Sequence, residues 1–443
     1  MYKIGLYERE ITPLFGNNLC GYFNARPVSG VKDKTYAKSV AVDKDGKTFA
    51  MLAIDACELS EELIKKIRIR VKSYTGISDE CLLISATHSH TAAPGSIDSP
   101  KSTEKIDEFY LEWLAMAAAD TVACANQRLE AAKIKFVNAR VENTTFVRNY
   151  LMKNGTARTN PGINNPDILR SLGEPDYDAP VLLFESADGR KLGMAYSFAN
   201  HQDSVDGTEV SADWSGVVSR KMKDRFGSDF ISIFFLGTAG DVNQVNVNNT
   251  DPSYKPECCY KYLGEKVYEA LSDALCSASE ISGDISVIND YKTYPTRFMN
   301  AEEEKAQRKI FESVVLPEDM KLDAASPPAL FFACMARRAL SHNENAEKTR
   351  DVRFQIIKLD RILIFALPGE VYSEFGKRIK SAFPENKCFF TCLANNGWSY
   401  MPTKDRYLPG LYESLFGSAK FYPEDTEDIF DRFIKLGKEL ISE

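Results

Sequence analysis

Runs of apolar residues bounded by turn residues predict most of the strands in this chain. Two runs, 39–42 and 49–55, flank Asp45-Gly46, a dipeptide typical of a tight β-hairpin. A second hairpin is expected around Asp188-Gly189, between runs at 180–185 and 192–198. Further strands are expected near the N-terminus and at residues 82–86, 135–142, 230–236, 283–295, 351–359, 362–367 and 388–393.

Apolar residues at intervals of three and four predict helices between these strands. The clearest begins at Ser60, a residue type favoured at helix N-caps, and runs to about residue 74. A longer helix should open at Ser102 and reach about residue 129. The others are expected at 212–226, 260–278, 301–314, 329–341, from just after Glu370 to about 383, and 426–441. This order predicts an α/β fold, with mixed β-sheets flanked by helices.

No internal repeat or low-complexity linker divides the 443 residues, so we expect a single domain over residues 1–443. The polar stretch 148–162 shows no clear period, and we expect a long loop there. Long loops inside compact domains often carry function. Its arginine, tyrosine, asparagine and lysine residues favour the wall of a binding site.

Charge and cysteine content narrow the class of protein. The net charge of -8 and the absence of a dense basic block argue against a nucleic-acid partner. No apolar run approaches the roughly 20 residues of a transmembrane helix, and the N-terminus does not resemble a signal peptide. The ten cysteines are scattered without a C-x-x-C, which favours free thiols and a cytoplasmic protein.

The histidines are few and clustered. The chain has four, and His88 and His90 follow one apolar run while His201 follows another. His342 sits near the end of a predicted helix, where a cation complements the helix dipole, so we interpret it as structural. Neutral imidazole is a common zinc ligand, and a strand end can hold it in place.

Five apolar strands end in polar residues of catalytic type. Ligands bind outside the carboxyl ends of strands in sheets with helical crossovers, so we expect these ends to meet at one cleft. The residues are His88 and His90, His201, Asp241 and Asn243, Glu370, and Asn395 and Tyr400.

Two imidazoles and a carboxylate from His88, His201 and Glu370 would form a zinc site with room for water. Such water suits the hydrolysis of an amide or an ester, and His90 could donate a hydrogen bond to substrate or oxyanion. Other interpretations stay open. His-x-His pairs also occur on surfaces, Asp241 could cap a turn, and Glu370 could be an acid of a first helical turn.

These motifs, in this order, resemble those of the neutral/alkaline non-lysosomal ceramidase family over nearly the whole chain. Residues 86–95, ATHSHTAAPG, resemble the family's A-T-H-T-H-S-G-P-G. The other matching motifs are Asn200-His201, Ser211-Ala212-Asp213, Pro368-Gly369-Glu370, and the stretch from Ala394-Asn395 through Tyr400 to Tyr407 and Tyr412-Glu413.

The resemblance implies zinc held by His88, His201, Glu370 and the phenol oxygen of Tyr400. It places His90, Arg148 and Tyr407 beside the scissile amide, and it adds the polar residues Glu10, Asp241 and Asn395 to the substrate site. Asn243 stands where the family has a serine, so a route through an acyl-serine is closed there. Attack by zinc-bound water stays possible, and Asn243 could donate a hydrogen bond as a catalytic residue. We expect no secretory signal and no C-terminal immunoglobulin-like domain of the kind that ceramidases carry.

The resemblance therefore predicts a zinc-dependent hydrolase that cleaves a linear amide with zinc-activated water. Its partner would be a small-molecule or lipid-like N-acyl substrate, and a shorter, soluble one is at least as plausible as ceramide. Asn243 also leaves two alternatives open. One is a non-catalytic ligand- or glycan-binding protein built on a ceramidase domain, and the other is a zinc esterase or phosphoester hydrolase.

Overall fold

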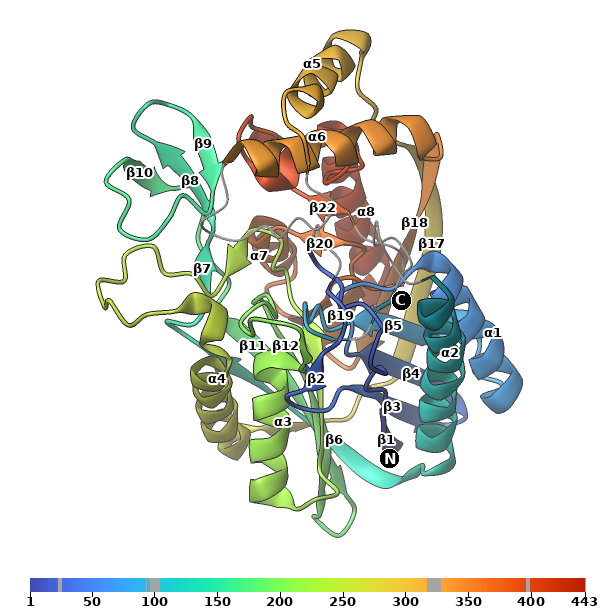
Figure 1. Ribbon diagram of the computed structural model, residues 1–443. Coiled ribbons are helices and arrows are strands. Elements are labelled where there is room, and N and C mark those ends of the chain that lie inside the picture. Colours follow the sequence, from blue (N-terminus) through green and yellow to red (C-terminus); the bar gives the residue numbers. More distant parts are fainter. Residues whose placement is uncertain (23–25, 93, 96–103, 317–327, 396–398, 443) are drawn as a thin grey trace.

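The computed structural model describes all residues except 23–25, 93, 96–103, 317–327, 396–398 and 443. Its described part contains two large β-sheets that face each other, with helices over their outer faces (Figure 1). This architecture confirms the predicted α/β fold with mixed sheets flanked by helices.

The larger sheet contains both predicted hairpins. Its strands are β1 (Tyr2–Glu10), β3 (Tyr36–Lys44), β4 (Lys47–Ile54), β5 (Leu82–Ala86), β6 (Glu130–Arg140), β11 (Asp178–Ser186), β12 (Lys191–Phe198), β14 (Ile231–Leu236) and β16 (Ser279–Ile281). The order is β14-β12-β11-β6-β1-β3-β4-β5, and β16 pairs with β6. Only the pairs β4–β5 and β12–β14 are parallel.

The smaller sheet has the order β17-β18-β19-β21. Its strands are β17 (Ile285–Pro295), β18 (Thr349–Leu359), β19 (Ile362–Ala366) and β21 (Lys387–Thr391). The pair β19–β21 is parallel and the other two pairs are antiparallel.

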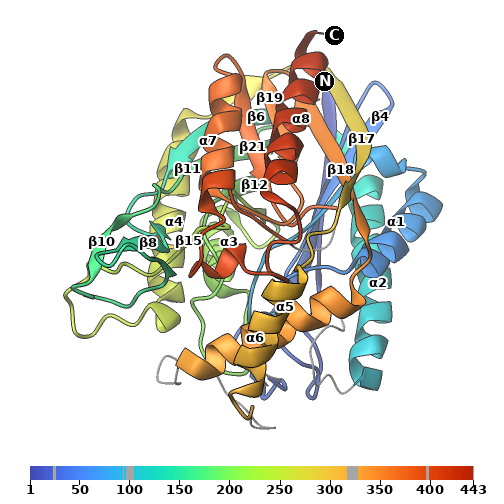
Figure 2. The ribbon, with the colours of Figure 1, turned by 90° about the horizontal axis from the view of Figure 1, so that it is seen from above.

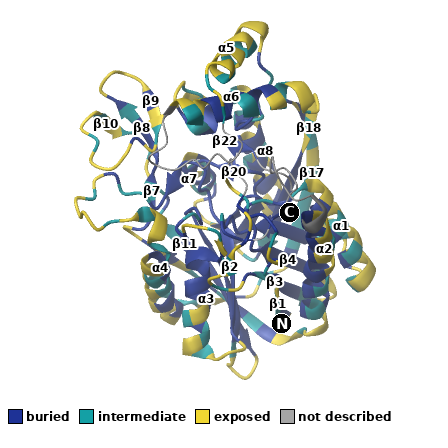
Figure 3. Cartoon of the chain, viewed as in Figure 1, coloured by how far each residue is buried: buried dark blue, intermediate teal, exposed yellow. Residues whose placement is uncertain are grey.

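Both faces of the central strands are buried, which explains their continuous apolar runs. In β19, Ile362 and Ile364 belong to the core between the two sheets. The alternate residues Leu363 and Phe365 belong to the core beneath the helices. Buried residues accordingly fill the centre of the molecule, and exposed ones gather on the outer helices and loops (Figure 3).

Helices cover each sheet on its outer side (Figures 1 and 2). Those on the larger sheet are α1 (Glu61–Thr75), α2 (Glu104–Gln127), α3 (Asp213–Phe226) and α4 (Tyr260–Ala274). Those on the smaller sheet are α7 (Ser373–Ala382) and α8 (Pro423–Ser442), while α5 (Ala301–Glu312) and α6 (Pro328–Asn345) pack on each other. The Ser60 side chain caps α1 as predicted, accepting from the Leu63 N–H at 3.2 Å. The predicted helix start at Ser102 lies outside the described residues.

Short strand pairs connect the loops at the sheet ends. They are β2 (Gly30–Val31) with β13 (Glu209–Val210), β7 (Phe146–Val147) with β15 (Val242–Asn243), and β20 (Glu370–Val371) with β22 (Tyr400–Met401). None of the helices in the described ranges is long and apolar enough to cross a membrane.

The prediction of a long loop at 148–162 is wrong. That segment carries β8 (Asn149–Met152) and β9 (Ala157–Thr159), which form a sheet with β10 (Ile168–Ser171) and project from one side of the molecule (Figures 1 and 2). Tyr150 and Met152 alternate along β8 and pack on Val247, a period-two pattern too short to be conspicuous among the polar residues.

Candidate metal centre

The segments that follow β5, β12 and β19 bring His88, His201 and Glu370 into contact. The Nε2 atom of His88 lies 3.2 Å from Oε2 of Glu370, and the Nε2 atom of His201 lies 3.1 Å from the same oxygen. All three residues are buried, with potential ligand atoms within 4.8 Å of one another. The structure thus joins the three residues that the sequence proposed as zinc ligands.

The backbone fixes the orientation of His88. Its φ of 71° is unusual for a residue with a side chain, and its N–H donates to the Ala56 carbonyl at 2.8 Å. Nδ1 lies 2.7 Å from the carbonyl oxygen of Cys57, which can only accept, so the proton sits on Nδ1. The lone pair of Nε2 is therefore free for a metal.

Hydrogen bonds from several segments fix the loop that carries His201. The Trp214 indole N–H donates to the His201 carbonyl at 2.9 Å. The next residue, Gln202, accepts from the His90 N–H at 2.9 Å, and Ser204 N–H donates to the buried Asp213 carboxylate at 2.9 Å. These bonds place the two histidine segments side by side.

Glu370 and Tyr400 are paired in β20 and β22. Gly369, at φ 71°, makes the close approach between the two segments possible, because a Cβ there would lie 2.2 Å from the Ser399 carbonyl. The Tyr400 ring is buried, and the guanidinium of Arg148 lies over it at 5.4 Å. Burial, then the charge of Glu370, raises the pKa of Tyr400 well above its usual value. Tyr400 thus lies beside Glu370, and its role as a fourth ligand stays a prediction.

The pKa shifts of Glu370 and His201 favour the protonation states that bind a metal, whereas the shift of His88 favours its protonated form in the absence of a cation. Burial works to raise the pKa of Glu370, but His88 and His201 hold it well below its usual value. Burial lowers the pKa of His88, and Glu370 more than reverses that shift. Burial and the charge of Arg148 lower the pKa of His201 to about 4. An ionised carboxylate beside a neutral imidazole is the state that binds a divalent metal.

The donor set fits zinc, for which two imidazoles and a carboxylate are common ligands. Oε2 of Glu370 is buried and accepts no hydrogen bond from the described residues, as expected of an oxygen that a cation would occupy. Cys57, His88 and His90 form a second possible group. It fits less well, because the hydrogen bond to the Cys57 carbonyl already engages Nδ1 of His88.

Arg148 and Glu413 form a buried ion pair against the cluster. The Nε atom of Arg148 lies 2.6 Å from Oε1 of Glu413, and one of its terminal nitrogens lies 3.3 Å from Nε2 of His201. Glu413 is fully buried and also accepts from Asn149 at 3.0 Å and Thr159 at 2.8 Å. Sequence reasoning gave Glu413 no role, and its position in the Tyr412-Glu413 motif was the one available signal.

His90 stands beside the cluster as predicted. Its Nε2 lies 3.4 Å from Nε2 of His88, and the two rings meet edge to face at 4.8 Å. Burial, then the charges of His88 and His201, lowers the pKa of His90 well below its usual value. The nearest carboxylate to its other nitrogen is that of Asp203, at 3.8 Å.

Asp241 and Asn243 lie next to Arg148, and the contacts of Asp241 serve the scaffold. Asp241 accepts from the N–H and hydroxyl of Ser373 at 2.7 and 2.9 Å, at the start of α7. Burial raises its pKa to about 6. Asn243 donates to Asn160 at 3.0 Å, on the strand β15 that pairs with β7 immediately before Arg148.

The structure does not bring Glu10, Tyr407 and Asn395 to the cluster. Glu10 is exposed at the end of β1, where it pairs with Lys34 at 2.7 Å. The Tyr407 hydroxyl donates to the Phe421 carbonyl at 3.0 Å and bonds Thr426. Asn395 joins β5 to β18 instead, since it accepts from Ile84 N–H and donates to Gln355. Each side chain is satisfied by neighbours from its own part of the fold.

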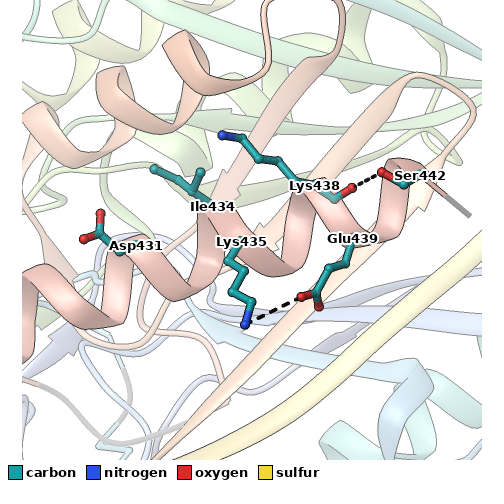
Figure 4. Close-up of a pocket in the computed structure, with 6 residues that line it drawn as sticks. All are labelled: Asp431, Ile434, Lys435, Lys438, Glu439 and Ser442. Atoms are coloured by element: carbon teal, nitrogen blue, oxygen red, sulfur yellow. Dashed lines mark hydrogen bonds and ion pairs between the residues drawn. The ribbon is translucent and has the colours of Figure 1, made fainter.

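Two surface hollows are lined by residues other than the proposed metal ligands. One runs along α8 and is lined by Asp431, Ile434, Lys435, Lys438, Glu439 and Ser442 (Figure 4). Another, of about 530 Å³, lies between α1 and β18 around Arg68, Asp79 and Arg353, and it includes Asn395. Arg68 and Arg353 share the Asp79 carboxylate, each at 2.8 Å, which ties α1 to β18 at this place.

The sequence of this chain matches a known protein family. The family model "Neutral/alkaline non-lysosomal ceramidase, N-terminal" matches residues 2–266. The chain belongs to this ceramidase family. It is 26% identical over 241 residues to "Neutral ceramidase 1" of Arabidopsis thaliana and 25% identical over 241 residues to "Neutral ceramidase" of Oryza sativa subsp. japonica. Each match covers 50% of this chain and 29% of the plant protein.

The ceramidase fold extends over nearly the whole chain. The crystal structure of neutral ceramidase from Pseudomonas aeruginosa superposes with a TM-score of 0.75 at 17% identity. It covers 98% of this chain and 73% of the bacterial chain. A ceramidase described as complexed with C2 gives a TM-score of 0.72, also at 17% identity, over 98% of this chain and 74% of that chain. At this identity the likeness establishes the fold, and the family prediction made from the motifs is confirmed by the sequence match.

Proposed function

We propose that this protein is a zinc-dependent hydrolase that cleaves a linear N-acyl amide bond. The observation that carries the proposal is the buried meeting of His88, His201 and Glu370, with Tyr400 beside them. Membership of the ceramidase family supports hydrolysis of an amide over the other reactions of such a site.

Each side chain has a task in this proposal. His88, His201, Glu370 and Tyr400 would hold zinc, which when bound supplies an activated water and polarises a carbonyl. Arg148 is fixed by Glu413 with its guanidinium against His201, so it can orient the substrate carbonyl. His90, with Nε2 facing the same space, would donate a hydrogen bond to the developing oxyanion.

The substrate in this proposal is smaller and more polar than ceramide. The Asn243 carboxamide cannot act as a nucleophile, which leaves direct attack by water as the route. Asn243 and Asn160 bond to each other beside the Arg148 strand, so this wall presents amides instead of apolar side chains. A short N-acyl compound suits such a wall better than two long hydrocarbon chains.

The test is a panel of short N-acyl amides, matched esters and phosphoesters, with turnover measured before and after removal of metal. We expect metal-dependent cleavage of amides, and we expect His88→Ala to abolish it. His342→Ala is the matched control, because that ring stacks on Phe298, away from the cluster, and should keep activity. Cleavage of esters or phosphoesters alone would assign a different hydrolase, and no turnover of any compound would favour the non-catalytic binding protein.

A further inference from the structure

The loop that carries His201 also carries a carboxylate, that of Asp203, with one oxygen that no described residue engages. Asp203 follows His201 by two residues, and 31% of its side chain is accessible, more than the 12% of neighbouring His90. Its Oδ1 accepts from the Tyr22 hydroxyl, and among the described residues no hydrogen bond or ion pair engages Oδ2. Asp203 is thus a solvent-accessible hydrogen-bond acceptor whose Oδ2 can accept a hydrogen bond from a ligand.

The position of Asp203 is next to the reacting groups. Its Oδ1 lies 3.8 Å from Nδ1 of His90, whose Nε2 lies 3.4 Å from Nε2 of His88. One imidazole ring therefore separates the carboxylate from the cluster. A substrate whose carbonyl sits at the cluster would reach Asp203 with a group only a few bonds from the scissile amide.

The surroundings hold Asp203 rigidly. Its carbonyl accepts from the side chain of Gln244, and the next residue, Ser204, is bonded to the buried Asp213. Tyr22 is fixed in turn, since its ring meets His90 edge to face at 5.5 Å and lies under the Arg26 guanidinium at 4.1 Å. An acceptor fixed in this way can bind a ligand without a large ordering cost.

We propose that Asp203 is a substrate-recognition residue that accepts a hydrogen bond from an ammonium or hydroxyl group placed close to the scissile amide. This inference rests on the proposed function and deepens it, because it names the substrate class as N-acyl compounds with a donor beside the amide. A carboxylate prefers an ammonium to a hydroxyl, and both to a methyl group, because charge-assisted hydrogen bonds are the stronger ones.

The experiment uses three amides that differ at one position. They are the N-(2-aminoethyl), N-(2-hydroxyethyl) and N-propyl amides of one short fatty acid, and a second set carries the same three end groups on the carbon next to the carbonyl. In one of the sets, wild type should prefer ammonium to methyl by about 10-fold or more in kcat/KM. Asp203→Asn should bring that ratio close to one, and Asp206→Asn, an exposed acid on the same loop, should keep it. Zinc content and thermal midpoint should match wild type in both variants.

The contrary result is equally specific. If Asp203→Asn lowers turnover of all three amides equally, Asp203 only positions His90 and the proposal is overturned. If no amide is cleaved, the proposed function fails. The role of Asp203 is then tested separately, by measuring the binding of the aminoethyl and propyl amides with ligand-detected NMR. An Asp203-dependent preference for the ammonium compound would support it, and equal binding to wild type and variant would overturn it.

Discussion

The buried Arg148–Glu413 pair allows a quantitative prediction. Glu413→Gln keeps the size of the side chain and an oxygen for Asn149 and Thr159, but it removes the negative charge 2.6 Å from the guanidinium. Burial works to lower the pKa of Arg148, while Tyr400 and Glu413 hold it well above its usual value, so the cation persists in the variant. It then lacks its closest counter-charge.

Removing one partner of a buried ion pair costs about 3–5 kcal/mol. We expect a loss of free energy of unfolding near the lower end of this range, about 3 kcal/mol. The reasons are that glutamine keeps one oxygen and that Glu370 still attracts the Arg148 cation. Domains are stable by about 5–15 kcal/mol, so this loss would be a large fraction of the total.

Urea unfolding of wild type and Glu413→Gln, in buffer with zinc, measures this loss. Glu424→Gln is the control, because its partner Lys404 and Glu424 itself are 61% and 67% exposed and such pairs contribute less than about 1 kcal/mol. A double-mutant cycle with Arg148→Met should return a coupling energy of similar size to the single loss. A loss below about 1 kcal/mol for Glu413→Gln would refute the reasoning that the pair is a buried, charge-compensated unit.

Three further predictions follow from other contacts. Burial raises the pKa of Asp241 from 3.8 to about 6, so the folded protein keeps this proton at pH values where the unfolded chain has released it. The stability that this proton contributes is therefore complete below about pH 4 and is lost as the pH rises to about 6. The variant Asp241→Asn cannot titrate at this position. Urea unfolding should therefore show the wild-type free energy of unfolding falling by about 3 kcal/mol relative to the variant across this pH window. Trp214→Phe removes the hydrogen bond from the indole to the His201 carbonyl and should weaken zinc binding about 10-fold in a chelator competition. The control Trp113→Phe, on the exposed face of α2, should leave zinc affinity unchanged. Equal zinc affinities of the two variants would contradict the role given to Trp214. Chelation should lower the thermal midpoint of wild type and leave that of His88→Ala unchanged, and a wild-type midpoint insensitive to chelator would argue against a metal in the fold.

The fold was predictable where burial imposes a period on the sequence. The hairpins around Asp45-Gly46 and Asp188-Gly189 and the strand before His88 lie where the sequence placed them, because strands buried on both faces leave long apolar runs. The small sheet β8–β10 escaped prediction because its strands are short and half exposed. Their pattern is set by contacts with distant residues such as Leu411.

The site was predictable for residues that sit directly at strand ends. His88, His201 and Glu370 are such residues. The strands before them are not parallel neighbours, because β5 and β12 run in opposite directions in the larger sheet and β19 belongs to the smaller one. Packing of the two sheets therefore brings these strand ends together, and no local pattern encodes that. Glu413 and Asp203 act through contacts between segments far apart in sequence, which no local pattern encodes. Tyr407 has the residue type the family motif suggests, yet its hydroxyl is satisfied by Phe421 and Thr426.

Zinc titration of the metal-free protein, with amide turnover followed at each step, tests the central claim most directly. The account predicts no turnover without metal, a rise up to about one equivalent of zinc per chain, and a plateau beyond it. His201→Ala should neither bind that equivalent nor gain activity. Full amide turnover in the metal-free protein, or one bound zinc in the variant, would contradict a centre built from His88, His201 and Glu370.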